Sequence, residues 1–279
     1  MISSPPSRPA NASPVASAFD ALAADYDATW TDSFIGGLQR RQVWHEVERI
    51  FRPGDRILEL GCGTGIDAVR LAGIGAQVHA LDVSAEMLRA TTRKIEREGL
   101  SHRITCELRA VEELSGIGGT GLFDGALSNF GVFNCVERLA STAFELARLL
   151  RRGGMLVLCI MGRFCAWETA WHLLHGRPRK AFRRLFAPKG GIESSLRSAC
   201  PFRVFYPSIS MLAGAFHEGF YLRSVRSIGV LVPPSYMEGW AVKRRRLVKR
   251  LSVWDQRLSQ WPVLRATGDH RLAIFVRRE

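Results

Sequence analysis

Several features that mark membrane, exported or metal-binding proteins are missing from this sequence. Its longest run of apolar residues, Met155–Met161, has seven residues, about a third of the roughly 20 that a membrane-spanning helix needs. The first fourteen residues are rich in Pro and Ser and lack the basic start and apolar core of a secretory signal. Six cysteines stand apart without a CxxC pair, so neither a zinc site nor a disulfide framework is expected. We therefore expect a cytoplasmic protein with reduced thiols and no metal.

Lysine is scarce, with 5 residues against 34 arginines, and acidic residues are scarce in the second half of the chain. Residues 1–150 carry 15 Lys and Arg against 19 Asp and Glu, a net charge of −4, whereas residues 151–279 carry 24 against 7, a net charge of +17. Such an excess attracts nucleic acid, anionic lipid or a phosphorylated or carboxylated substrate. Arg-rich codon usage explains it equally well, and the sequence leaves both explanations open.

The 279 residues show no internal repeat, and 47% are hydrophobic and 23% charged. These values are typical of one globular domain with a sizeable core. Short apolar strands then alternate with helices. The expected strands are 56–60, 77–81, 104–108, 123–128 and 155–160, and the expected helices between them are 68–72, 85–98, 112–114 and 137–150. This alternation predicts an α/β fold with a parallel sheet, right-handed crossovers and helices on both faces.

The flanking segments have other patterns. Residues 1–16, rich in Pro, Ser and Ala, are expected to be a disordered tail, and residues 17–50 show helical spacing with a break near 29–37. After residue 161 we expect an amphipathic helix at 164–174, a basic helix through Leu185, a strand at 222–232, a basic helix at 237–258 and a strand at 271–277. The last two strands are expected to close the sheet in antiparallel orientation.

A glycine-rich loop follows the first strand. The strand runs into Gly61-Cys62-Gly63-Thr64-Gly65, and glycines there allow a sharp turn and a close approach of the backbone to a ligand at the next helix N-terminus. Asp82, at the end of the second strand, is placed to accept both hydroxyls of a ribose. The third glycine comes one residue too soon for a dinucleotide GxGxxG loop, and Glu59 precedes the first. The pattern therefore predicts a nucleoside-bearing cofactor other than a dinucleotide.

The motifs ILELGCGTG (57–65) and HALDVSAEML (79–88) resemble those of class I S-adenosylmethionine-dependent methyltransferases. The resemblance covers residues 17–160 and is close to the small-molecule "type 11" group, which includes quinone and biotin biosynthesis enzymes. It implies a Rossmann-like, mostly parallel seven-stranded sheet with helices on both faces, an N-terminal helical lid and an insertion after the fifth strand. It also implies that S-adenosyl-L-methionine is the cofactor.

The resemblance assigns roles to residues around the loop. The three glycines would lie against the methionine part of the cofactor, with Glu59 near its ammonium group or a bound water. Asp82 would hold the ribose, and Val83 and Met87 would border the adenine. The cofactor-binding residues implied by the whole resemblance are Tyr26, Glu59, Gly61, Cys62, Gly63, Gly65, Asp82, Val83, Met87, Val111, Glu112, Ser128, Asn129 and Phe130.

Two further segments match the family and one departs from it. Residues 19–27 match an FDxxAxxYD lid, so Tyr26 would cover the methionine end, and Ser128-Asn129-Phe130 would face the sulfonium and the acceptor. Many relatives place an Asp after the third strand to meet the adenine amine, but Arg-Ala-Val-Glu-Glu stands there in this chain. The Val111 backbone or Glu112 would take over that contact.

Acceptor specificity in this family lies after the fifth strand, where the resemblance is thin. The stripe Phe164/Trp167/Trp171 fits either an acceptor cap or ordinary core packing. The candidate acceptor contacts are Trp30, Asn134, Trp167 and Trp171. The downstream histidines suited to deprotonating a hydroxyl are His172, His175, His217 and His270, of which His172 and His217 are retained as candidate catalytic residues. Methyl transfer from a sulfonium requires no universal acid or base.

We expect methyl transfer to a small acceptor that is apolar or anionic, such as a quinone, lipid or natural product. The alternatives are a nucleic-acid methyltransferase that uses the basic half to follow phosphates, and a non-catalytic protein that only holds the cofactor. No NPPY-type motif follows the fourth strand, which makes nucleobase amines less expected acceptors. Peripheral contact with an anionic membrane through residues 163–184 would fit a lipid or quinone acceptor.

The same reasoning divides the chain. After the tail, residues 17–279 are expected to form one methyltransferase domain. Its parts are a lid at 17–50, a cofactor-binding core at 51–160, an acceptor-cap insertion at 161–220 and a sheet-closing part at 221–279. The oligomeric state, the acceptor and the methylated atom are not determined by the sequence.

Overall fold

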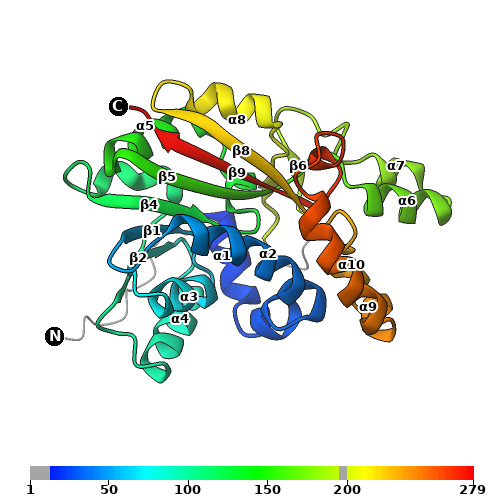
Figure 1. Cartoon of the computed structure of the whole chain (residues 1–279), viewed down its shortest axis with the longest axis horizontal. Coiled ribbons are helices and arrows are strands. Elements are labelled where there is room, and N and C mark those ends of the chain that lie inside the picture. The colour runs from blue at the N-terminus through cyan, green and yellow to red at the C-terminus, as the bar shows by residue number, and fades with distance from the viewer. Residues whose placement is uncertain (1–12, 195–199) are drawn as a thin grey trace.

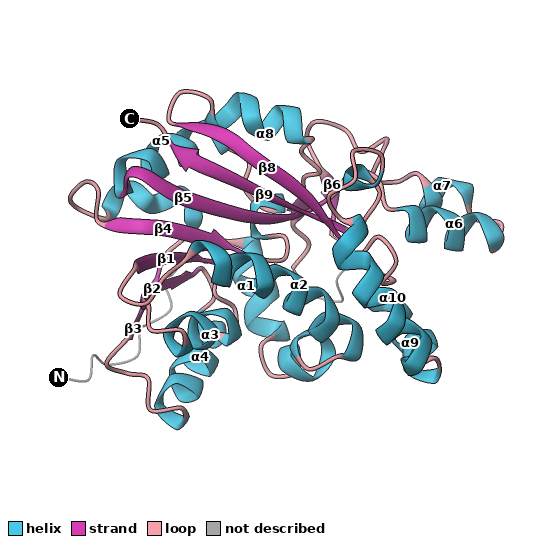
Figure 2. Cartoon of the chain, viewed as in Figure 1, coloured by secondary structure: helices cyan, strands magenta, loops and turns pink. Residues whose placement is uncertain are grey.

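A computed structural model describes residues 13–194 and 200–279. Seven strands form one sheet in the order β3-β2-β1-β4-β5-β9-β8 (Figure 2). The strands are β1 Arg56–Leu60, β2 Gln77–Asp82, β3 Ile104–Leu108, β4 Phe123–Ser128, β5 Leu150–Met161, β8 Phe220–Ile228 and β9 His270–Arg277. The first five are parallel, whereas β9 runs antiparallel to both β5 and β8. The predicted fold class and the antiparallel closure of the sheet are confirmed.

Helices cover both faces of the sheet (Figure 1). One face carries α5 (Leu139–Leu149) and α8 (Ile209–Phe216), which pack on each other. The other face carries α2 (Phe34–Ile50), α3 (Ile66–Gly73) and α4 (Ala85–Arg97). A separate apolar core lies on each side, because the central strands are buried on both faces.

The N-terminal segment differs from its prediction. Residues 1–12 of the expected disordered tail lie outside the described residues, but the rest of that tail begins a helix. The Ser13 side chain caps α1 (Pro14–Leu22) by accepting from the Ala16 amide, and Pro14 is pre-set for a first helical position. A π-helical turn, Asp27–Thr31, connects α1 to α2. The break in the helical segment therefore falls earlier than predicted.

The segment after β5 is less regular than predicted. The first helix, α6 (Ala166–Leu174), agrees with its prediction, but the second, α7 (Pro178–Ala181), has only four residues. A two-stranded ribbon, β6 (Ile192–Glu193) with β7 (Arg203–Val204), was not predicted. The basic helix expected at 237–258 is divided at Arg244 into α9 (Glu238–Lys243) and α10 (Arg245–Leu258). Four of these helices, α6, α7, α9 and α10, gather at one end of the molecule (Figure 1).

Candidate active site

The glycine loop has a backbone that only glycine adopts readily. Gly61, Gly63 and Gly65 have φ values of +71°, +56° and +81°. A Cβ on Gly61 would lie 2.4 Å from a methyl carbon of Val132, so this glycine is required by packing. A Cβ on Gly63 would meet nothing closer than a Tyr26 ring carbon at 4.0 Å. Gly63 and Tyr26 both line a space where a ligand can approach the backbone.

Asp82 is fixed beside this space. Its Oδ2 accepts from the Gly63 amide at 2.8 Å and its Oδ1 accepts from the Ser84 amide at 2.9 Å. Burial raises the pKa of Asp82 to about 6, although these amides act in the opposite direction. Each carboxylate oxygen keeps lone-pair capacity for a further donor. The pair of oxygens is therefore suited to a ligand diol.

Glu59 lies beneath the loop with an incomplete set of partners. Only 2% of the residue is exposed, and its Oε2 has no hydrogen-bond partner in the described part of the chain. Burial raises the pKa of Glu59 well above its ordinary value, and the nearby Asp67 charge adds to this effect while Arg40 opposes it. A buried carboxyl without a donor is costly. The site therefore has a place for a cationic or hydrogen-bonding group that the chain itself does not supply.

A cavity of about 610 Å³ extends from the loop across the carboxyl ends of the strands. This is the position where open α/β sheets bind ligands. The predicted site residues that line it are Tyr26, Trp30, Gly61, Gly63, Asp82, Val83, Met87, Val111, Glu112, Asn129 and Phe130. The structure thus brings most of the predicted cofactor residues together around one cavity.

Two acidic residues, whose roles the sequence did not reveal, bind the lid segment to the glycine loop and to the start of α4. Asp20 in α1 accepts from the Ser84 hydroxyl at 2.6 Å and from the Glu86 amide at 3.1 Å. Asp27 accepts from the Thr64 hydroxyl and forms an ion pair with Lys94 at 2.9 Å. Both residues belong to the FDxxAxxYD segment, but their partners are distant in sequence. These contacts hold the Tyr26 ring over the loop.

The end of β4 carries a strained residue at the cavity wall. Phe130 has φ +46°, a left-handed conformation that is costly for a bulky side chain. The Phe130 amide donates a hydrogen bond to Oδ1 of the preceding residue, Asn129, at 3.0 Å. Asn129 Nδ2 in turn donates to Asp67 at 3.0 Å. The Arg40 guanidinium lies 4.8 Å from the centre of the Phe130 ring. Buried polar contacts therefore determine how this aromatic ring faces the cavity.

Beyond Phe130 the cavity is lined by residues that the sequence did not place there. His270, the first residue of β9, packs edge-on against the Phe130 ring with centroids 5.1 Å apart. Its Nδ1 lies 3.4 Å from Asp269 Oδ2 but makes no hydrogen bond with the described residues. Burial lowers the pKa of His270, although the Asp269 charge opposes this effect. A neutral imidazole at the cavity wall can accept a proton near pH 7.

The remaining cavity lining comes from the segment after β5 and from the chain before α9. It includes apolar, tyrosine and arginine side chains. They are Met161, Arg183, Arg184, Phe202, Val204, Tyr206 and Tyr236. The segment predicted to cap the acceptor therefore does reach the cavity, but through residues with no regular spacing.

Two of the three tryptophans predicted to contact the acceptor, Trp167 and Trp171, do not line the cavity. They pack with Phe34 and Trp240 in a small core between α6, α2 and α9. The rings of Trp167 and Trp240 are 5.7 Å apart. This corrects the acceptor-cap interpretation of the aromatic stripe in favour of core packing.

Asn134 is also corrected, from a ligand contact to a structural residue. Its Nδ2 donates to the Phe205 carbonyl at 2.7 Å and its Oδ1 accepts from the Met161 amide at 2.8 Å. The Asn134 side chain is fully buried. Its two hydrogen bonds connect the end of β5 to the chain that follows the β6–β7 ribbon. The amide has no capacity left for an acceptor.

Neither candidate catalytic histidine lines the cavity. The His172 ring stacks on Tyr236 with centroids 6.1 Å apart, and of the two only Tyr236 lines the cavity. His217 ends α8, and its Nδ1 bonds the Gly214 carbonyl at 2.7 Å. Three residues predicted to bind the cofactor, Cys62, Gly65 and Ser128, are also absent from the cavity lining. Cys62 and Gly65 pack against Thr91, and the Ser128 hydroxyl donates to the Leu60 carbonyl.

Comparison with known proteins agrees with this geometry. Residues 57–154 match a family profile described as a methyltransferase domain. The chain is 30% identical over 183 residues to the demethylmenaquinone methyltransferase of Symbiobacterium thermophilum, a match that covers 59% of this chain and 70% of that protein. It is 34% identical over 150 residues to the demethylmenaquinone methyltransferase of Mycolicibacterium vanbaalenii. This second match covers 52% of the chain and spans 59% of the relative's length.

The fold is shared with solved structures of low sequence identity. Geranyl diphosphate C-methyltransferase of Streptomyces coelicolor, in complex with Mg²⁺, geranyl diphosphate and S-adenosyl-L-homocysteine, matches with a TM-score of 0.56 at 14% identity. The match covers 86% of this chain and 78% of that one. It therefore extends beyond the cofactor half to the segment that lines the far end of the cavity.

Proposed function

The chain belongs to the class I S-adenosylmethionine-dependent methyltransferases, and we propose that it transfers the methyl group of S-adenosylmethionine to a small-molecule acceptor. The observation that carries this proposal is the cavity lined by Gly63 and Tyr26, next to the two oxygens of Asp82. The cavity continues past Phe130, so it has room for a second ligand.

The residues present fit the cofactor. Asp82 supplies two acceptors for a ribose diol, and Val83 and Met87 offer an apolar border for an adenine. An ammonium group, or a water that it holds, would satisfy the orphaned Glu59 carboxyl. When bound, S-adenosylmethionine supplies an electrophilic methyl group that is already activated. The protein's task is therefore orientation and the exclusion of water, which Tyr26 and the lid provide.

His270 replaces the two histidines of the sequence prediction as the proposed proton acceptor. It lies at the cavity wall beside Phe130, with the Asp269 carboxylate 3.4 Å from its Nδ1. Nε2 would take a proton from an acceptor hydroxyl and release it to solvent after transfer. Acceptors that carry no such proton would not need this residue.

We propose that the acceptor is apolar or carries an anionic group, because aromatic and aliphatic side chains share the far end of the cavity with Arg183 and Arg184. Both arginines pair with Glu168, and Glu193 also lines this end, so the apolar side chains carry most of this argument. The relatives named above act on a quinone, as their names state. Nothing in these comparisons supports the nucleic-acid alternative. Among the described residues, no helix is both long and apolar enough to cross a membrane.

The cellular location and the division of the chain are also proposals. A cytoplasmic location is supported by buried thiols: burial raises the pKa of Cys159 and Cys165 to about 12, which keeps them protonated and unreactive. The division into lid, cofactor core, acceptor segment and sheet-closing part is supported by the lining, since each of the four parts contributes residues to one cavity.

Binding of S-adenosylhomocysteine tests the function directly. The purified protein should bind it, and S-adenosylmethionine, with a dissociation constant on the order of micromolar, and should bind NAD at least about 100-fold more weakly. The loop lacks the GxGxxG spacing that binds the pyrophosphate of a dinucleotide. Isothermal titration calorimetry measures both constants. Tight NAD binding without binding of S-adenosylhomocysteine would contradict the proposal.

The pH dependence of binding tests the role of Asp82. Because the pKa of Asp82 is raised to about 6, the carboxylate that accepts the ribose hydroxyls should be lost as the pH falls below that value. Affinity for S-adenosylhomocysteine should be constant above pH 7 and fall by up to about tenfold per pH unit below 6. Asp82→Asn should bind weakly at pH 7.5 without a further decline to pH 5. A wild-type profile that matches the variant's would disprove the assignment.

A further inference from the structure

Exposed apolar side chains are concentrated at the end of the molecule that holds α6, α7, α9 and α10. Most of the large hydrophobic residues that face solvent lie in residues 173–186 and 236–263. They are Leu173, Leu174, Leu185, Phe186, Tyr236, Val242, Leu247, Val253, Trp254, Trp261 and Val263. Exposed aromatic and aliphatic groups in such number mark an interaction surface.

The same two stretches hold most of the chain's net charge. Residues 173–186 and 236–263 contain twelve Lys and Arg against two Asp and Glu. Both acidic residues are used inside the protein: Glu238 accepts from the Phe34 and Ile35 amides, and Asp255 is fully buried. The solvent side of these stretches is therefore almost purely cationic.

Helix α10 shows how the two kinds of residue are combined. Its inner face is fixed to the body of the protein by Val248 and by Asp255, which accepts from the Gln42 side chain and the Val230 and Leu231 amides. Its outer face carries residues at spacings of three and four, which share one side of a helix. This α10 surface consists of Arg246, Arg250, Val253, Trp254, Arg257 and, just beyond the helix, Trp261.

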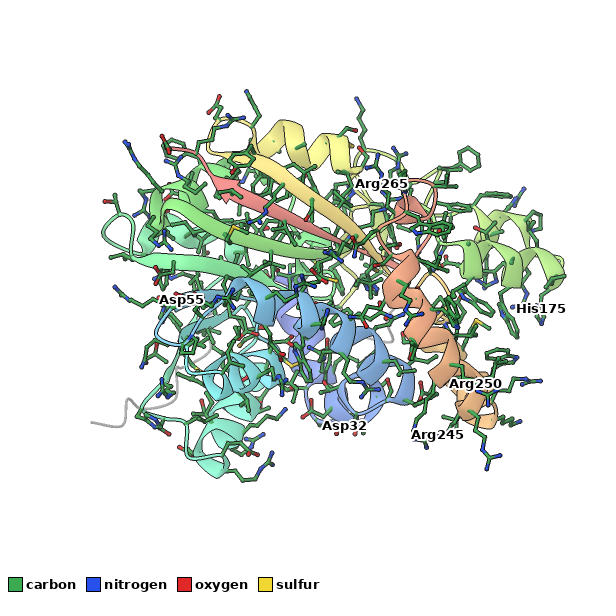
Figure 3. The ribbon with its side chains drawn as sticks, viewed as in Figure 1. Asp32, Asp55, His175, Arg245, Arg250 and Arg265 are labelled. Carbon is green, nitrogen blue, oxygen red and sulfur yellow. The ribbon has the colours of Figure 1, made fainter. Side chains whose placement is uncertain are left out.

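Within the α10 surface, cations and apolar groups lie side by side. Trp254 is 55% exposed, and the Arg257 guanidinium lies 5.2 Å from the centre of its ring. Figure 3 shows Arg250 at the outer side of this end of the molecule. Tryptophan with long basic side chains is the combination found where proteins meet the headgroup region of a bilayer.

The tips of the neighbouring helices continue this character. Leu174, at the end of α6, is 84% exposed, and Phe186, after α7, is 78% exposed. The basic residues Arg177, Arg179 and Lys180 lie between them in the sequence. Helix α6 is held beside α9 by the Trp167–Trp240 contact, so its tip and the α10 surface belong to one end of the fold (Figure 1).

We propose that the α10 surface, with the tips of α6 and α7, docks the protein on an anionic membrane. A nucleic acid would be attracted by the same arginines, but it offers no apolar layer for side chains such as Leu174, Val253 and Val263. A bilayer offers both phosphate groups for the cations and an apolar layer for these side chains. The proposal moves the membrane contact expected at 163–184 mainly onto α10.

Docking would also bring the cavity close to the lipid. Tyr236 lines the cavity and is half exposed at the start of α9, between the cavity and the docking helices. An amphiphilic acceptor could then pass from the bilayer to His270 without crossing water. This consequence rests on the proposed function, whereas the docking itself does not.

Sedimentation with lipid vesicles tests the docking. The full chain is mixed with vesicles of phosphatidylcholine alone or with about 30% phosphatidylglycerol. Binding to the anionic vesicles should be at least about tenfold tighter and should weaken as salt is raised. Arg246→Glu with Arg250→Glu should reduce it at least about tenfold. Arg93→Glu with Arg97→Glu, on the exposed side of α4, is the matched control and should stay within about twofold of wild type.

A second pair of variants separates a bilayer from a nucleic acid. Trp254→Ser with Trp261→Ser should weaken vesicle binding at least about fivefold, whereas Phe144→Ser, an exposed apolar residue on α5, should leave it unchanged. Equal binding to neutral and anionic vesicles, or no binding, overturns the proposal. So does tight binding of an RNA duplex by a protein that ignores vesicles. S-adenosylhomocysteine binding, measured on every variant, confirms folding and reports separately on the proposed function.

Discussion

Gly63→Ala is expected to reduce affinity for S-adenosylhomocysteine by about 100-fold or more, equivalent to about 2.7 kcal/mol, in a protein that still folds. Gly63 has φ +56° and faces the space below the Tyr26 ring. A methyl group there would lie at ordinary van der Waals distance, 4.0 Å, from a Tyr26 ring carbon, so the fold accommodates it, but it would occupy ligand space. The backbone could then no longer approach the cofactor closely.

Gly99→Ala is the matched control for this experiment. Gly99 has φ +68° and nothing within 4 Å of an added Cβ, and it lies after α4, outside the cavity lining. Both substitutions should cost about 1–2 kcal/mol of stability through the left-handed backbone, measured by chemical denaturation. Only Gly63→Ala should lose binding in calorimetry. Equal affinities in the two variants would show that the cofactor does not use the loop.

Asp67→Ala is expected to destabilise the fold by about 3–5 kcal/mol. Asp67, at the start of α3, is buried and accepts from Arg40, from the Trp44 indole at 2.6 Å and from Asn129 at 3.0 Å. Its removal leaves the Arg40 charge buried without its partner. The melting temperature should fall by roughly 6–20 °C, as measured by scanning calorimetry.

Glu48→Ala provides the comparison for Asp67→Ala. Glu48 pairs with Arg70, and both side chains are partly exposed. A surface pair of this kind contributes about 0–1 kcal/mol, so the melting temperature should change little. If Asp67→Ala were as mild as Glu48→Ala, the Arg40 charge would have to be stabilised by Glu59 or solvent. The role assigned to the Arg40–Asp67 pair would then be incorrect.

The strands from residue 51 to residue 128 were predictable because local pattern and fold agree there. Strands β1 and β3 begin and end at the predicted residues, and β2 and β4 differ by at most one, since each is an apolar run closed by glycine or a polar residue. The start of β5 was missed because Leu150–Gly154 continues the pairing with β4 through a register shift. Such an irregularity depends on the partner strand and leaves no periodic signal.

The acceptor end was less predictable, for reasons of tertiary structure. A stripe such as Trp167 and Trp171 has the same spacing whether it faces a ligand or a neighbouring helix, and here it faces α9. His270 looked like three other downstream histidines, because only the insertion of β9 beside β5 brings it to Phe130. The cofactor end, by contrast, is built mainly within consecutive strand–loop–helix units, which a motif describes completely.

The position of β9 constrains the order of events during synthesis. β9 follows all other described strands in the chain, yet it lies between β5 and β8 in the sheet. At about 5–20 residues per second, roughly 5–20 s separate the emergence of Met161 from that of His270. During this interval the nascent chain can form its cofactor half, but the edge of β5 stays unpaired and open to aggregation or chaperone binding. The acceptor end of the cavity, which His270 lines, is thus complete only when β9 has paired with β5.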